Sequence, residues 1–233
     1  MRIEAISDVG LVRKGNEDSY LINRRLGLFV VADGMGGHEA GEVASFLAVK
    51  TLEETLENNK ESEGALVLAI QAANSEIFRQ AQEKPYLNGM GTTLTAVYYH
   101  NGKAYLGHVG DSRAYLIRNF QATLLTRDHS LVDELVRSGH ISEEEAQNHP
   151  QRHIVTRALG TEASVEVDIL SPAIEQGDRL LLCTDGLSNL VKPEEIIQAV
   201  NSTNIPRDAL EMLRQQALER GGFDNITALL IEF

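Results

Sequence analysis

Short apolar runs bounded by polar or glycine-containing turns recur along the chain, and their length is typical of β-strands. Residues 28–32 form one such run, rich in β-branched side chains, which ends at Asp33. Residues 180–183 repeat the pattern shortly before Asp185. We therefore expect both carboxylates to lie where buried strands end. Further strands are predicted at residues 3–7 and 226–233.

A helical periodicity of apolar residues predicts two long amphipathic helices, at residues 39–58 and 63–83. Two more helices are predicted at residues 193–200 and 207–220. The apolar face of the first long helix is expected to consist of Val43, Leu47, Leu52 and Leu56, and that of the second of Leu66, Ile70, Ala73, Ile77 and Ala81.

Consecutive strands in the middle of the chain predict an antiparallel sheet. Residues 94–100 and 103–109 flank Asn101-Gly102, a pair typical of a two-residue hairpin turn. Another strand is expected at residues 114–118. Strands joined in this way form a meander rather than a βαβ array, and together with the helices they indicate an α+β fold.

Residues 127–160 differ in character from the rest of the chain. They hold four of the seven histidines and four arginines, with short helices predicted at 130–137 and 142–148. Ser142 and Glu145 have the spacing of a capping box at the start of the second helix. We interpret this segment as a cationic insertion that forms a lid, within a single domain covering residues 1–233.

Composition narrows the functional classes. The chain has 21 basic and 34 acidic residues, a formal net charge of −13, which disfavours binding to nucleic acid and to anionic membranes. Its single cysteine, Cys183, excludes an internal disulfide and is typical of a reducing compartment. We see no signal peptide, and no apolar run approaches the roughly 18 residues of a membrane span. A cytoplasmic location is expected.

Four aspartates share one local setting. Each lies beside glycine or asparagine where an apolar run meets a turn. If these strand ends converge, the unpaired carboxylates repel one another and raise each other's pKa. A pair of divalent cations removes that cost, since carboxylate oxygens suit Mg²⁺ and Mn²⁺. The alternative is that these residues belong to ordinary turns. The four are Asp33, Asp111, Asp185 and Asp224.

Competing phosphate and nucleophile chemistries lack their motifs. The glycines after Asp33 precede a helix, but no Lys-Ser/Thr pair of a nucleotide-binding P-loop follows them. The dinucleotide fingerprint fails because Glu39 stands at its third glycine. Cys183 lacks the preceding histidine of a cysteine phosphatase, and no Gly-x-Ser-x-Gly elbow occurs.

Six short motifs follow one another in order along the chain. They are Arg13-x-x-Asn16-Glu17-Asp18, Asp33-Gly34-Met35-Gly36-Gly37-His38, Gly91-Thr92-Thr93, Gly110-Asp111-Ser112-Arg113, Asp185-Gly186 and Asp224-Asn225. With this ordered set the chain resembles, over essentially its whole length, the metal-dependent serine/threonine protein phosphatases of the 2C type in their short bacterial form. That resemblance implies a four-layer αββα sandwich of two antiparallel sheets flanked by helices.

The resemblance implies a centre of two Mn²⁺ or Mg²⁺ ions, with a third ion beside it. Asp33 would bridge the first two ions, and a water or hydroxide between them would attack phosphorus in line, without a phosphoenzyme. The remaining ligands implied are Glu17, Asp18 and the Gly34 carbonyl at the first ion, Asp185 and Asp224 at the second, and Asp111 with Asp185 at the third.

Two further residues acquire roles from the same resemblance. Arg13 would grip the phosphate, and its alternative is a surface salt bridge with Glu17 or Asp18. His38 is a candidate general acid for the leaving serine or threonine oxygen. Eukaryotic relatives carry a histidine shortly after the bridging aspartate, where this chain has Met35, so a loop-stabilising hydrogen bond is the alternative for His38.

Residues 127–160 match the flap of the bacterial relatives. Arg152 and Arg157 would there contact the phosphate or acidic neighbours of a phosphoprotein, or pair with the glutamates at 143–145. The implied function is hydrolysis of phosphoserine and phosphothreonine in proteins by a monomer, with a serine/threonine kinase as a partner. A metal-dependent phosphohydrolase of small phosphorylated metabolites and a catalytically silent, phosphatase-like regulatory module are the alternatives.

Overall fold

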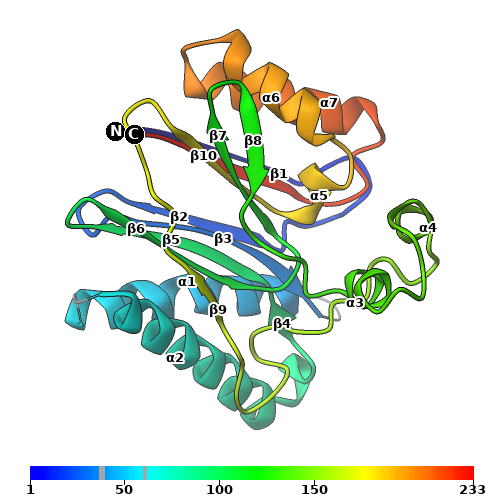
Figure 1. Cartoon of the computed structure of the whole chain (residues 1–233). Helices are drawn as coiled ribbons and strands as arrows, with labels where there is room; N and C mark the ends of the chain where they lie inside the picture. The colour runs from blue at the N-terminus through cyan, green and yellow to red at the C-terminus, as the bar shows by residue number, and fades with distance from the viewer. Residues whose placement is uncertain (37–39, 60–61) are drawn as a thin grey trace.

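Two antiparallel sheets pack face to face in the computed structural model, which describes residues 1–36, 40–59 and 62–233 (Figure 1). Sheet A has five strands in the order β1 (Arg2–Asp8), β11 (Ile226–Glu232), β10 (Arg179–Cys183), β7 (Arg113–Arg118) and β8 (Gln121–Leu124). Sheet B has six, in the order β2 (Asp18–Asn23), β3 (Leu28–Met35), β5 (Leu94–His100), β6 (Lys103–Val109) and β9 (Asp168–Leu170), with β4 (Gly91–Thr92) paired to β3.

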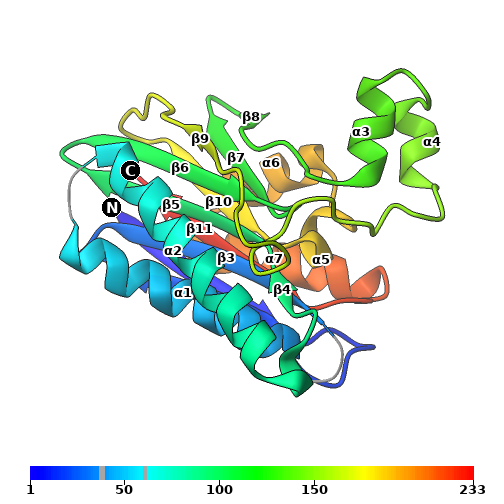
Figure 2. The same ribbon diagram turned by 90° about the horizontal axis from the view of Figure 1, so that it is seen from below.

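Two pairs of helices cover the outer faces of the sheets (Figure 1 and Figure 2). On sheet B lie α1 (Ala40–Asn58) and α2 (Ser62–Glu83), and on sheet A lie α6 (Pro193–Ser202) and α7 (Pro206–Glu219). The arrangement confirms the expected four-layer αββα sandwich. Each helix pair encloses its own apolar cluster, and a third cluster fills the space between the sheets, where Phe29, Val31, Leu106, Leu182 and Leu229 are fully buried.

The two long helices bury different kinds of side chain. The predicted face of α2 is confirmed, since Leu66, Ile70, Ala73, Ile77 and Ala81 are all buried. In α1 the prediction is only half right: Leu52 and Leu56 are buried, whereas Val43 and Leu47 are partly buried. Small residues take the centre of its face instead, because α1 packs close to β3. They are Ala40, Gly41, Ala44, Ser45 and Ala48.

Local turn signals match the structure. Asn101 and Gly102 join β5 to β6 with φ of 50° and 76°, the positive values that a tight hairpin turn requires. Ser142 and Glu145 form the predicted capping box of α4 (Glu143–Gln147). Together with α3 (Leu131–Arg137), α4 projects from one end of the sandwich (Figure 2).

Several short elements were not predicted. They are β8, β9, the 3₁₀ turn η1 (Pro85–Leu87) and the one-turn helix α5 (Asp185–Ser188). Each is too short for a periodic pattern and depends on the element it packs against. In the part of the chain that the structure describes, no helix is both long and apolar enough to cross a membrane.

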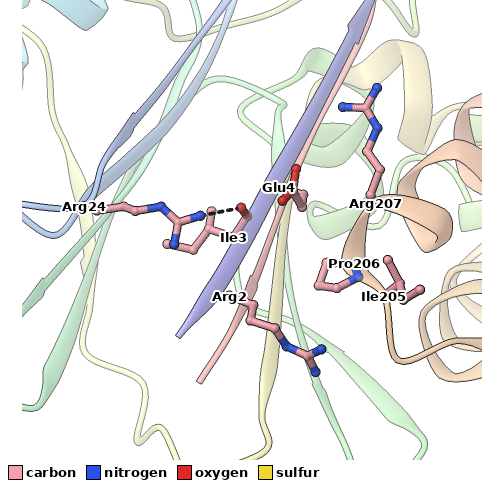
Figure 3. A pocket seen from close by; sticks show the side chains of 7 residues that line it. All are labelled: Arg2, Ile3, Glu4, Arg24, Ile205, Pro206 and Arg207. Atoms are coloured by element: carbon pink, nitrogen blue, oxygen red, sulfur yellow. Dashed lines mark hydrogen bonds between the residues drawn. The ribbon is translucent and has the colours of Figure 1, made fainter.

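The free edge of β1 is covered by arginine side chains. Arg24, from the turn between β2 and β3, donates from Nη2 to the Ile3 carbonyl at 2.9 Å (Figure 3). Arg207, at the start of α7, donates from Nη1 to the Ala5 carbonyl at 3.3 Å. Charged groups over an edge strand prevent it from pairing with the strand of another chain.

Candidate metal centre

Strand ends bring the predicted aspartates to one end of the sandwich, beside α3 and α4 (Figure 1). Asp18 at the start of β2 is directly opposite Asp33 on β3. Asp185 opens α5 just after β10, and Asp224 precedes β11, the strand paired with β10. Asp111 occupies the turn between β6 and β7. Five carboxylates from distant parts of the sequence therefore share one site.

The carboxylates perturb one another strongly. Burial, followed by the negative charges of Asp18, Asp185, Asp111 and Asp224, raises the pKa of Asp33 well above its usual value. Burial is also the main cause that raises the pKa of Asp18 and that of Asp111, each to about 7. The pKa of Asp185 rises for the same reason. Without a counter-charge, the cluster holds protons near neutral pH.

Two oxygens in the cluster have no partner. Asp18 Oδ1 and Asp185 Oδ1 are buried and make no hydrogen bond within the described residues, although Asp18 Oδ2 accepts from Thr184 Oγ1 at 2.9 Å. Burying a carboxylate oxygen without a partner costs free energy, and coordination to a hard divalent cation removes that cost. The all-oxygen donor set therefore fits Mg²⁺ or Mn²⁺. Among the described residues, no three carboxylate, imidazole or thiolate side chains are already arranged to hold a metal ion.

Threonines hold the backbone of Asp33 in place. Its N–H donates to Thr93 Oγ1 at 2.9 Å, and its carbonyl accepts from Thr92 Oγ1 at 2.8 Å. Thr93 Oγ1 also lies 2.8 Å from Ser112 Oγ, beside Asp111. The Gly-Thr-Thr motif thus ties the two aspartate loops together. Its place in an ordered motif was visible in the sequence, but this contact was not.

Asn225 fixes the loop that carries Glu17. Its Oδ1 accepts from the Glu17 N–H at 2.8 Å, and its Nδ2 donates to the carbonyls of Val9 and Gly15, each at 3.0 Å. Glu17 is partly buried, and burial is the main cause that raises its pKa. The asparagine after Asp224 therefore positions the loop between β1 and β2 against the start of β11.

Arg13 pairs with Asp224 rather than with Glu17 or Asp18. Its Nη2 lies 2.7 Å from Asp224 Oδ2, and this hydrogen bond is the main cause that raises the pKa of Arg13. The proposed salt bridge to Glu17 or Asp18 was therefore wrong in its partner. About half of the Arg13 side chain is exposed, so the guanidinium is accessible beside the cluster.

The two flap arginines differ in their surroundings. Arg157 Nη1 lies 2.7 Å from Asp168 Oδ1, and its Nη2 lies 3.4 Å from Glu166, so the proposed pairing with glutamates 143–145 is wrong for this residue. The Arg152 side chain is exposed. His38 lies outside the described residues.

His129 was not singled out from the sequence, yet it holds the Asp111 turn. Its ring Nδ1 accepts from the Gly110 N–H at 3.0 Å, and the backbone N–H of His129 donates to the Gly110 carbonyl at 2.8 Å. On the other side of the ring, Nε2 lies 3.2 Å from Asp168 Oδ2. No sequence pattern distinguishes this histidine from its neighbours, because the contact joins residues 19 positions apart.

Comparison with known proteins gives consistent results. Residues 14–220 match the family model described as "Protein phosphatase 2C". The chain is 42% identical over 241 residues to the serine/threonine phosphatase stp of Listeria innocua, covering 100% of this chain and 96% of that protein. It is also 42% identical to the serine/threonine protein phosphatase PstP of Mycobacterium tuberculosis, of which it covers 45%.

Solved structures extend the comparison to the fold. A crystal structure of the M. tuberculosis phosphatase PstP/Ppp superimposes with a TM-score of 0.91 at 42% identity, covering 100% of this chain and 99% of that one. A structure of the PstP catalytic domain in complex with 2 manganese ions gives a TM-score of 0.86 at 40% identity, covering 98% and 96%.

Proposed function

This chain belongs to the protein phosphatase 2C family of metal-dependent serine/threonine protein phosphatases, and from that premise we propose that its carboxylate cluster binds two Mn²⁺ or Mg²⁺ ions and carries the reaction. The observation that carries the proposal is the set of mutually repelling carboxylates with two buried, unpartnered oxygens. A relative with this fold is described in complex with 2 manganese ions, which supports the same stoichiometry here.

The ligand assignments follow the family resemblance, and the clustering of the carboxylates supports them. We assign Asp33 as the residue that both ions would share, since Asp18, Asp185, Asp111 and Asp224 all raise its pKa. We assign Glu17, Asp18 and the Gly34 carbonyl to the first ion, and Asp185 and Asp224 to the second. When bound, the cations supply Lewis acidity, which lowers the pKa of a coordinated water and neutralises charge on the phosphoryl oxygens.

Arg13 and His38 act on the phosphate and on the leaving group. The Arg13 fork is planar and always charged, which suits two oxygens of a phosphoryl group, and Asp224 holds it beside the cluster. We assign His38 as the general acid that protonates the leaving serine or threonine oxygen. A hydrogen bond within its own loop remains the alternative role for this histidine.

We also propose a third cation, bound by Asp111 and Asp185. After burial, the charge of Asp185 is the largest cause that raises the pKa of Asp111, which supports a cation shared by these two carboxylates. His129 and Ser112 hold the turn that carries Asp111.

The remaining assignments concern the whole chain. We propose that residues 1–233 form one catalytic domain of the 2C type, with residues 127–160 as a flap over the metal centre, where the exposed Arg152 contacts the substrate. Arg157, held by Asp168, positions the base of the flap instead. The substrates are phosphorylated proteins. We further propose a cytoplasmic monomer that opposes a serine/threonine kinase and dephosphorylates that kinase as well.

The metal-dependent mechanism is tested with p-nitrophenyl phosphate. Hydrolysis is expected to require Mn²⁺, to stop with a chelator and to fall at least about a thousandfold in Asp33→Asn, because both cations lose their shared ligand. Asp178→Asn is the matched control, since that buried carboxylate pairs with Arg118 and stands outside the cluster. Full turnover in chelator, or equal losses in both variants, would refute the mechanism.

The third cation is tested separately. Asp111→Ala is expected to retain two tight Mn²⁺ sites by calorimetric titration while its activity falls at limiting Mn²⁺. If Asp111→Ala shows wild-type kinetics at every Mn²⁺ concentration, the third cation is refuted, and the proposal of the first two cations is unaffected.

Substrate class is tested by comparing kcat/KM on a phosphothreonine peptide with kcat/KM on sugar phosphates. Preference for the peptide is expected, because the proposed flap offers Arg152 for contacts with the protein around the phosphate. Preference for the sugar phosphates would contradict the assignment of phosphorylated proteins as substrates.

A further inference from the structure

Three exposed apolar side chains adjoin the carboxylate cluster. Leu11 and Val12, in the loop between β1 and β2, are 67% and 62% exposed, and Phe223, in the turn before β11, is 62% exposed. We call these three residues the Leu11–Phe223 patch. Side chains of this size are usually buried, so a group of them at a functional site calls for an explanation.

The patch is built by two loops that are fixed to each other. The Leu11 N–H donates to the Gly222 carbonyl at 2.8 Å. A Cβ on Gly222 would lie 3.2 Å from Leu11 Cγ, and a Cβ on Gly221 would overlap the ring of Phe223. Leu11 and Phe223 therefore cover adjacent glycines, which adopt positive φ of 46° and 115°. Side chains at these glycines would displace the patch.

The patch residues directly precede, along the chain, the two residues that pair beside the proposed phosphate site. Val12 directly precedes Arg13, Phe223 directly precedes Asp224, and Arg13 and Asp224 are joined at 2.7 Å. Other large apolar side chains are as exposed as these, including Leu68 at 61% and Phe120 at 74%, so exposure alone is not the argument. What sets the patch apart is its attachment to the residues around the cations.

We propose that the Leu11–Phe223 patch binds an apolar residue that flanks the phosphorylated serine or threonine of a protein substrate. This proposal rests on the proposed function and deepens it by naming a substrate preference. A phosphopeptide carries negative charge and the chain carries a net charge of −13, so away from the proposed cation site the two charges disfavour association. Apolar contact with a flanking residue adds attraction that needs no charge, next to the Arg13 guanidinium.

The experiment uses the whole chain with Mn²⁺ and a set of phosphothreonine peptides of equal length and charge. In each peptide one position on either side of the phosphothreonine is leucine or serine. The leucine peptides are expected to have about tenfold higher kcat/KM at one or more positions, mainly through a lower KM. The variants are Leu11→Ser, Val12→Ser and Phe223→Ser, and p-nitrophenyl phosphate is the reference substrate because it has no flanking residue.

In the patch variants the leucine preference is expected to disappear, so the ratio of peptide to p-nitrophenyl phosphate kcat/KM falls about tenfold. Leu68→Ser and Phe120→Ser are the matched controls and should keep the wild-type preference, because both lie away from the cluster. A wild-type enzyme without the preference, or patch variants that keep it, would overturn the proposal. If the wild type does not hydrolyse p-nitrophenyl phosphate with Mn²⁺, the proposed function itself is refuted.

Discussion

Gly41, in the first turn of α1, lies against the backbone of Gly34, the residue after Asp33. A Cβ on Gly41 would lie 2.8 Å from the carbonyl carbon of Gly34 and 2.9 Å from Cδ of Glu17, and a Cβ on Gly34 would overlap the Gly41 carbonyl. Ser45, one turn further along α1, donates to the Glu17 carbonyl at 2.6 Å. The start of α1 therefore sets the position of the loop that we assign to the first cation.

We expect Gly41→Ala to weaken Mn²⁺ binding by roughly tenfold, because the added methyl group separates α1 from Gly34 and displaces Glu17. Calorimetric titration of the purified protein measures this directly. Gly107→Ala is the control, since its methyl group crowds Ile70 Cδ1 at 2.5 Å in the core under α2, away from the cluster. A wild-type Mn²⁺ affinity in Gly41→Ala would mean that α1 does not position the site.

Stabilisation by Mn²⁺ should increase with pH. The folded-state pKa values of Asp18 and Asp111 are raised to about 7, so their protonated forms favour the fold below the unfolded value, and this stability is lost as pH rises through about 7. Mn²⁺ competes with these protons and replaces the lost stability. The rise in Tm on adding Mn²⁺ should be roughly 5 °C larger at pH 7.5 than at pH 5.5. An equal rise at both pH values would contradict this.

His108 should make the protein less stable in mild acid. Burial lowers its pKa to about 4 from 6.5, and the neutral ring bridges Thr95 Oγ1 and the Arg127 carbonyl, each at 2.9 Å. Between these values the unfolded chain binds more protons, so the contribution of His108 to stability falls by about 1 kcal/mol from pH 6.5 to 5.5. Asp18 and Asp111 act in the opposite direction over this interval, so the measurement is the difference between the wild type and His108→Gln. By urea unfolding at both pH values, the wild type should lose about 1 kcal/mol relative to this variant, and an unchanged difference would contradict the prediction.

Cys183 should be inert in the folded protein. It is fully buried, and burial raises the pKa of its thiol to about 12, so almost no thiolate exists at neutral pH. Ellman's reagent is expected to label it only after unfolding, and phosphatase activity should survive treatment with iodoacetamide. Rapid labelling of the folded enzyme together with loss of activity would contradict this and would indicate that the Cys183 thiol is needed for activity.

Much of the fold follows from periodicity, because long elements bury continuous faces. The face of α2 and the hairpin at Asn101 are examples. The face of α1 was only partly predicted, since its close approach to β3 selects small residues such as Ala44 that carry little periodic signal.

Part of the candidate site could also be predicted from the sequence. Aspartates at strand ends could be located from local patterns, and recognition of the family motifs assigned them a chemistry. The partner of Arg13 and the role of His129 could not be predicted, because both depend on which distant loops meet in three dimensions.

Asp33, Asp185 and Asp224 must share cations for the proposed mechanism to operate. Anomalous diffraction from a crystal grown with Mn²⁺ tests this most directly. We expect two strong peaks in contact with Asp33, one of them also touching Asp185 and Asp224, and a weaker third peak beside Asp111. Peaks that lie elsewhere, with Asp33 bound to none of them, would contradict the mechanism.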